Sequence, residues 1–384
     1  MSTRANAIHK LLLRGSVAAF VLSLLLFGVG NTALAGPLLV AAFAMAGVGV
    51  RGSEKLGGIS FSLLIFAGVS FALCYPAPLV SLGDFRLSTL IVPLLQIIMF
   101  GMGVSLSMSD FIGIVKEPKL VFLGAACQYT IMPFVAVMLT MVFPLDAEVA
   151  AGVILIGAAP SGLASNVMTY ISKGNLALSV TVTTLATLLA PLFTPFYMQW
   201  LGGQFIAVDP WSMMLNIIEI TILPIGAGLL FNKFLHGKTA WLDRLMPALS
   251  MGGIVLILMI MTAGGRDNLL EIGLLLIAIS LIHNIAGYTL GYWSARALGA
   301  DERSCRTIAF EVGQQNAGLA TGLAQEMGKI ATVGLVPTVF GSLMNITGAT
   351  LATWWRERPP RDAAGAEAPE SKPGASNQLK ANET

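Results

Sequence analysis

Long apolar segments recur along almost the whole chain, and this recurrence restricts the possible folds more than any other feature. Only 11% of the residues are charged, against roughly 25% in an average soluble domain, and the mean hydropathy is +0.79. The sequence therefore predicts an all-α polytopic membrane protein with a ten-span core. The ten segments of bilayer-spanning length lie at about 57–76, 88–107, 120–143, 147–171, 175–199, 211–233, 244–264, 269–295, 303–327 and 331–355.

Basic residues are concentrated in every second connection between these segments. If residue 57 begins on the cytoplasmic side, fourteen Lys and Arg residues fall on that side, and only Arg86, Arg266 and Lys329 fall on the other. Cytoplasmic connections carry an excess of Lys and Arg in membrane proteins. We therefore predict a multi-pass protein of the cell (inner) membrane in which both ends of the core at 57–356 are cytoplasmic.

Residues 1–56 form an N-terminal extension with two possible interpretations. Three basic residues precede an apolar stretch at 15–34, which fits a signal peptide with Ala33-x-Ala35 as its cleavage site. The same residues fit an uncleaved first span that turns at Gly36-Pro37 into a short apolar arm over 37–50. We favour the uncleaved hairpin, because nothing beyond it needs a secretory start.

The C-terminal end, residues 357–384, has a different composition from the core. It combines Pro, Gly, Ala and Ser with charged residues and lacks the apolar residues that a folded core needs. We predict a disordered cytoplasmic tail.

Two polar stretches interrupt the apolar pattern. Glu311-Val-Gly-Gln-Gln-Asn-Ala-Gly-Leu-Ala320 divides the ninth segment, and Pro160-Ser-Gly-Leu-Ala-Ser-Asn166 divides the fourth. An ionised carboxylate is costly in hydrocarbon, so Glu311 must face a cavity, a partner or an ion. Glycine and proline weaken a helix, and amide side chains can satisfy the backbone groups that a break frees. Each stretch therefore predicts a broken span.

The two breaks occupy corresponding places in two halves of the core. Gln314 lies 103 residues after Trp211, and the same offset from Gly57 leads to Pro160. Paired interruptions of this kind are typical of transporters built from inverted repeats. We predict repeats at 57–199 and 211–355 with opposite topology. Ser165, Asn166 and Asn316 are residue types that cap the helix starts such breaks create.

Further oxygen-bearing side chains lie within apolar segments. Ser179 and Thr183 are four residues apart and share one helix face, while Gln128 and Asn345 are isolated polar residues. Such groups commonly bond their own backbone or a neighbouring helix. Together with Glu311 they also supply the hard oxygen ligands that sodium prefers. The three cysteines and three histidines do not cluster, so no disulfide framework or zinc site is implied.

These residues resemble the bile acid:sodium symporter family over about 57–356. The resemblance implies a panel domain of spans 1, 2, 6 and 7 and a core domain of spans 3–5 and 8–10, with spans 4 and 9 broken and crossing. The matching motifs are Gln128-Tyr-Thr-Ile-Met-Pro133, Ala164-Ser-Asn-Val-Met-Thr-Tyr170, Gly174-Asn-Leu-Ala-Leu-Ser-Val180, Thr183-Thr184 and Glu311-Val-Gly-x-Gln-Asn316.

The resemblance also implies two sodium sites that share Glu311. The first consists of Ser165, Asn166, Ser179, Thr183 and Glu311. The second consists of Gln128, Glu311, Gln315 and the backbone oxygens of Val312 and Gln314.

The implied substrate site consists of Asn316, Asn345, Ser161 and Leu163. The chain departs from several bacterial relatives at Leu163, where they have Thr, and at Met344, where they have His. These differences favour a substrate other than a bile acid.

We therefore expect a sodium-coupled symporter that binds two sodium ions and carries a small organic monocarboxylate by alternating access. Pantoate, pyruvate or a related 2-oxo or 2-hydroxy acid fits this description. Within the same class, the alternative is a bile-acid-like amphipathic organic anion.

From another class, a membrane-embedded lipid-modifying enzyme would need an acid cluster or metal ligands, and no such motif appears. A passive channel is a third alternative. We expect neither enzymatic activity nor a nucleic-acid partner.

Overall fold

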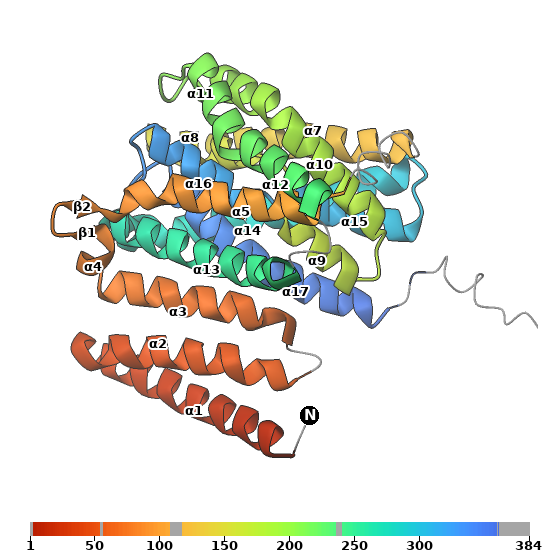
Figure 1. The fold of residues 1–384 in the computed structure, drawn as a ribbon. Coiled ribbons are helices and arrows are strands. Elements are labelled where there is room, and N and C mark those ends of the chain that lie inside the picture. The colour runs from red at the N-terminus through yellow and green to blue at the C-terminus, as the bar shows by residue number, and fades with distance from the viewer. Residues whose placement is uncertain (1–2, 54–56, 108–116, 236–239, 359, 361–384) are drawn as a thin grey trace, which may run out of the picture.

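The protein is a bundle of long helices, seen here in a computed structural model that describes residues 3–53, 57–107, 117–235, 240–358 and 360 (Figure 1). Nine helical stretches in this part of the chain are long and apolar enough to cross a bilayer. This confirms the prediction of an all-α polytopic membrane protein. The ten-span count and the repeats stay predictions. Of the predicted disordered tail, all but residues 357, 358 and 360 lies outside the described residues.

The N-terminal extension forms a hairpin of two helices, α1 (Thr3–Gly28) and α2 (Thr32–Gly49), at one edge of the bundle (Figure 1). The expected turn at Gly36-Pro37 is wrong, because Pro37 lies inside α2 and the chain turns at 29–31. Gly30 adopts the positive φ of 77° that the turn requires, and the Asn31 side chain accepts the backbone N–H of Leu34 at 3.3 Å. The second arm is consequently long enough to span a bilayer.

The remaining elements follow in chain order. They are η1 (Val50–Gly52), η2 (Gly57–Ile59), α3 (Ser60–Cys74), α4 (Ala77–Val80), β1 (Ser81–Leu82), β2 (Phe85–Arg86), η3 (Leu87–Leu90), α5 (Ile91–Ser105), α7 (Pro118–Val142), α8 (Ala147–Ala158), α9 (Ala164–Ile171), α10 (Leu176–Tyr197), η4 (Met198–Gly202), α11 (Pro210–Ile217), η5 (Ile218–Ile222), α12 (Leu223–Leu235), α13 (Ala240–Gly264), α14 (Arg266–Ala297), α15 (Glu302–Gly313), α16 (Ala317–Glu326) and α17 (Leu335–Arg356). The two short strands pair in an antiparallel hairpin.

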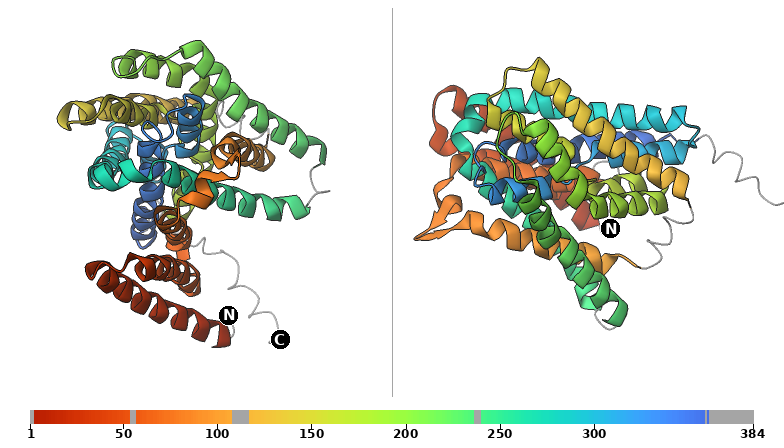
Figure 2. Two further views of the ribbon diagram at one scale, coloured as in Figure 1. Left: turned by 90° about the vertical axis from the view of Figure 1, so that its left-hand side faces the viewer. Right: turned by 90° about the horizontal axis from the view of Figure 1, so that it is seen from above.

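The helices of the bundle pack in two groups, which two further views show (Figure 2). In one group α5 packs against α12 and α13, and α13 packs against α3, whose other side carries α2. In the other group α14 packs against α7, α15 and α17, and α7 packs against α8 and α10. The two broken segments, α8–α9 and α15–α16, both belong to the second group.

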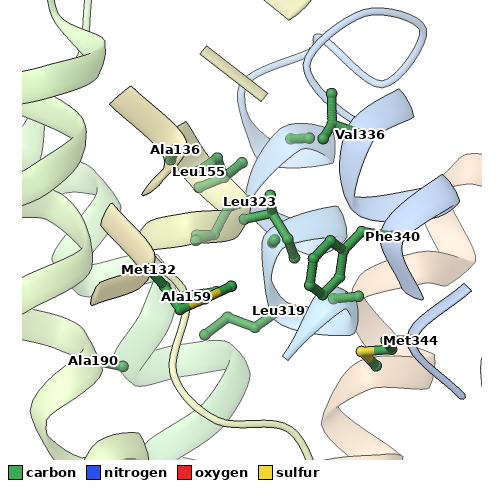
Figure 3. Close-up of a cluster of buried hydrophobic side chains, with 14 of the residues drawn as sticks. Met132, Ala136, Leu155, Ala159, Ala190, Leu319, Leu323, Val336, Phe340 and Met344 are labelled. Atoms are coloured by element: carbon green, nitrogen blue, oxygen red, sulfur yellow. The ribbon is translucent and has the colours of Figure 1, made fainter. Parts of the chain in front are cut away.

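A buried apolar cluster surrounds the two breaks (Figure 3). Leu155 and Ala159 from the first broken segment gather there with Leu319 and Leu323 from the second, and Phe340 of α17 is almost fully buried beside them. Burying a side chain of this size stabilises the fold by roughly 1.5–3 kcal/mol. The apolar cluster therefore stabilises the irregular backbone of both breaks, between α8 and α9 and between α15 and α16.

Polar contacts tie the bundle together at its two ends. At one end, Arg306 donates to the carbonyls of Ser172 (3.0 Å) and Trp355 (3.2 Å). At the other, Lys329 forms an ion pair with Glu148. Three of the places that the basic-residue count assigned to one side, the end of α9, the start of α15 and the end of α17, thus meet at one end of the bundle.

Candidate functional site

The backbones of the two breaks bind each other. The N–H of Gly162 donates to the carbonyl of Gln314, and the N–H of Asn316 donates to the carbonyl of Pro160, both at 2.8 Å. Ser161 and Gln315 form an antiparallel bridge between these bonds. Polar backbone groups inside a membrane need partners, and here each break supplies them to the other. The sequence had suggested that amide side chains would do this.

Gly162 is required by this close approach. A Cβ at this position would lie 2.5 Å from the carbonyl oxygen of Gln315, which is shorter than real Cβ contacts allow. Any other residue would push the two breaks apart.

Glu311, near the end of α15, is fully buried and is surrounded by hydroxyl groups. Its Oε1 accepts from Ser165 of α9 at 2.7 Å and from Ser179 of α10 at 2.6 Å, and its Oε2 accepts from Thr183 at 2.8 Å. Asn166 joins the group, because its Oδ1 lies 2.8 Å from the hydroxyl oxygen of Ser179. All five residues of the first predicted sodium site therefore lie together.

This group lacks a positive charge of its own. Among the described residues, Arg266, Arg306 and Lys329 form ion pairs with Asp267, Glu302 and Glu148, and Glu311 takes part in none of these pairs. A buried carboxylate without a counter-charge is costly. Carboxylate, hydroxyl and amide oxygens are the ligands that hard cations prefer, so a small cation bound among them would neutralise the carboxylate.

The residues of the second predicted site also lie together, but they bond mainly to one another. The Gln128 and Gln315 side chains exchange hydrogen bonds of 2.7 and 3.2 Å, and Gln315 also donates to the carbonyl of Val312 at 2.6 Å. The backbone carbonyl of Gln314 accepts from Gly162. The three hydroxyl contacts of the Glu311 carboxylate all lie in the first group.

A cavity of about 510 Å³ lies beside the two breaks. One wall comes from α3, α5 and α13, and the other from the breaks, α16 and α17. Leu163, Asn316 and Asn345 line it, and none of the described residues that line it is charged. Ser161 is absent from the lining, since its hydroxyl turns away and donates to the backbone carbonyl of Glu311 at 2.7 Å.

The two half-helix starts at this cavity are built differently. Asn316 caps α16 as expected, because its Oδ1 accepts the N–H of Leu319 at 3.0 Å. The expected caps of α9 are wrong. Its N-cap is Leu163, without a side-chain bond, and Ser165 and Asn166 lie inside the helix. Their side chains are directed to the Glu311 group instead.

Two features of the site region were missed in the sequence. The buried Gln314 side chain donates to Tyr288 and to the carbonyl of Met344, both at 3.3 Å, so it faces α14 and α17. Arg306, almost fully buried, pairs with Glu302 one turn earlier. An acid and a base four residues apart at the start of a span could have indicated this pair.

Comparison with known proteins gives consistent results. A model of the sodium bile acid symporter family matches residues 92–272. An uncharacterized sodium-dependent transporter of Bacillus subtilis is 42% identical over 282 residues, which cover 73% of this chain and 87% of that protein. A probable chloroplastic sodium/metabolite cotransporter of Arabidopsis thaliana is 35% identical, with 70% and 67% covered. The human ileal sodium/bile acid cotransporter is 32% identical, with 66% and 76% covered.

Proposed function

We propose that this chain, which belongs to the sodium bile acid symporter family, couples the entry of sodium to that of a small organic monocarboxylate by alternating access. The buried Glu311 carboxylate carries the proposal, because three hydroxyl oxygens converge on it and no basic residue in the described part of the chain pairs with it. The relatives are named as transporters or cotransporters, which favours transport over an enzymatic function.

The breaks offer a physical route for coupling ion and substrate. Gln315 lines the cavity and bonds to the carbonyl of Val312, and Ser161 bonds to the carbonyl of Glu311. Sodium at Glu311 would therefore fix the backbone that presents the starts of α9 and α16 to the cavity. A second sodium would bind where Gln128 and Gln315 meet, once these amides release each other.

In this proposal the two helix groups move relative to each other. The panel consists of α3, α5, α11–α12 and α13, and the core consists of α7–α10 and α14–α17. The inverted repeats span 57–199 and 211–355, and residues 1–56 extend the panel through the packing of α2 on α3.

The cavity favours one negative charge on the substrate. In the described part of the chain its lining holds no charged side chain, so a carboxylate would be held by the positive ends of α9 and α16 and by the amides of Asn316 and Asn345. Pantoate, pyruvate and related 2-oxo or 2-hydroxy acids fit this description.

A bile-acid-like amphipathic anion is the second candidate, and the wall of the cavity supports it. Much of this wall is apolar, including Phe61, Leu95, Ile98, Met251 and Ile254. A substrate with a large apolar body would fill more of the 510 Å³ than pyruvate does.

Transport into proteoliposomes on a solid-supported membrane tests the proposal. Two sodium ions with one monocarboxylate would move one net positive charge per cycle, which gains roughly 2.3 kcal/mol per 100 mV. We expect inward current only when sodium and substrate are added together. Electroneutral uptake would contradict the two-sodium assignment. A preference for steroid anions would select the second candidate, and a preference for dicarboxylates would contradict both.

A further inference from the structure

One face of α11 and α12 carries an acidic residue in the middle of an exposed apolar stripe. Glu219 is exposed and lies one turn from an exposed leucine on either side. This α12 face consists of Trp211, Leu215, Glu219, Leu223, Leu230 and Phe234, and its five apolar members are 48–71% exposed. Exposed apolar residues along a whole span are expected to face lipid. An acid among them needs a partner, because a carboxyl group in hydrocarbon is costly.

A second polar side chain, Gln96 of α5, lies at the same depth. Its Nε2 donates to the backbone carbonyl of Glu219 at 3.4 Å. That carbonyl is available because the chain forms a π turn at Ile218–Ile222, in which Leu223 bonds back to Ile218. The next residue, Pro224, has no N–H to donate to Glu219. The structure thus places the Gln96 carboxamide against the backbone of the residue that carries this carboxyl group.

A glycine in this stripe would also allow a neighbouring helix to approach closely. Gly226, two turns after Glu219, is a position where a Cβ would meet no atom within 4 Å. Small residues on a membrane helix let a neighbouring backbone come near. A helix face that combines a polar residue with such a glycine is typical of a helix that packs against another.

We propose that a second copy of this chain docks against the α12 face, with the Glu219 carboxyl of each copy bonded to the Gln96 carboxamide of the other. Two copies inserted in the same direction in a bilayer are related by an axis along the membrane normal, so groups at equal depth meet. Gln96 and Glu219 share one depth. Gln96 and Glu219 of one copy can therefore face Glu219 and Gln96 of the other. The same contact then occurs twice and gives the Glu219 carboxyl group of each copy a partner.

Cysteine cross-linking of the full chain in its membrane tests the docking. In a background with Cys74, Cys127 and Cys305 replaced by alanine, Leu215→Cys and Leu223→Cys should each form disulfide-linked dimers on mild oxidation. Leu274→Cys is the matched control, since Leu274 of α14 is 86% exposed on another helix. If neither position cross-links more than Leu274→Cys, or if both link to a different protein, the inference is wrong.

Substitution of the acid tests its chemistry. In bilayers, Glu219→Leu should lower the dimer association constant roughly tenfold, because it removes two symmetry-related hydrogen bonds. Glu219→Gln should keep the dimer, since an amide can both donate and accept. Elution of both variants as one symmetric species in detergent checks folding. An unchanged association constant in Glu219→Leu would overturn the proposed pairing.

Discussion

At the residue scale, Glu311 differs from an ordinary buried acid, because hydroxyl groups on two other helices bond to it and no basic residue that the structure describes pairs with it. Replacing Glu311 with Gln keeps the size of the side chain and removes the charge that would attract sodium. We expect Glu311→Gln to reduce sodium-driven uptake to background while the protein stays folded in detergent.

Uptake under a sodium gradient, compared with a potassium gradient, measures this effect. Glu271→Gln is a suitable control, because Glu271 is exposed on α14 and should transport normally. Undiminished sodium dependence in Glu311→Gln would remove Glu311 from the ion site.

Asn316 is expected to act on the substrate more than on sodium. Its side chain caps α16 and lines the cavity, whereas the hydroxyl groups that bond to the Glu311 carboxylate come from Ser165, Ser179 and Thr183. Asn316→Ala should raise the substrate KM about tenfold, or ~1.4 kcal/mol, and leave the sodium dependence nearly unchanged. Sodium titrations of uptake at saturating substrate separate the two effects. An equal loss of both affinities would assign Asn316 to the ion site.

At the scale of elements, the pairing of the two breaks depends on the absence of a side chain at Gly162. Gly162→Ala forces a Cβ against the carbonyl of Gln315, and overpacking of this kind destabilises a protein by about 1–3 kcal/mol. We expect a lower melting temperature and a weaker response of that temperature to sodium.

Gly252→Ala provides the matched comparison, because a Cβ at Gly252 would meet no atom within 4 Å. It should be neutral or slightly stabilising in its helix. If Gly162→Ala melts like Gly252→Ala, the breaks are not held together by this contact.

The sequence predicted the elements better than their contacts. Equal offsets in two halves located both breaks, since glycine, proline and polar residues interrupt a helix wherever it packs. The pairing of Gly162 with Gln314 could not be predicted, because it joins residues from separate segments of the chain. The turn at 29–31 was missed because Pro37 is a stronger turn signal than Gly30-Asn31, and the surrounding helix nevertheless tolerates Pro37.

For the candidate site, the sequence predicts which residue types take part, but the direction in which each side chain points depends on the fold. Local preference predicts Ser165 and Asn166 as helix caps, and only the family resemblance places them with Glu311, which is where their side chains lie. Gln314 and Gln315 are adjacent and chemically identical, yet they face opposite sides of the break. A helix period cannot be applied across a break, so the local pattern could not separate their roles, and only the family resemblance distinguished the Gln315 side chain from the Gln314 backbone.

At the scale of the whole molecule, the excess of basic residues on one side predicts the orientation in the membrane. The segment between Lys233 and Arg244 should be cytoplasmic. Single cysteines placed there, in a background lacking Cys74, Cys127 and Cys305, should resist impermeant maleimides in intact cells.

A cysteine at Asp84, in the short strand hairpin at the other end of α5, should label readily under the same conditions. The reverse pattern would invert the orientation of every helix from α3 to α17.

The interlocked breaks also constrain how the protein can be made. Ser161 and its partner Glu311 are 150 residues apart, and a ribosome needs roughly eight to thirty seconds to add that many residues. Until α15 and α16 have been synthesised, the first break has no second break to pair with. The polar backbone groups of the first break therefore lack these partners during synthesis, and the site is completed only late in biogenesis.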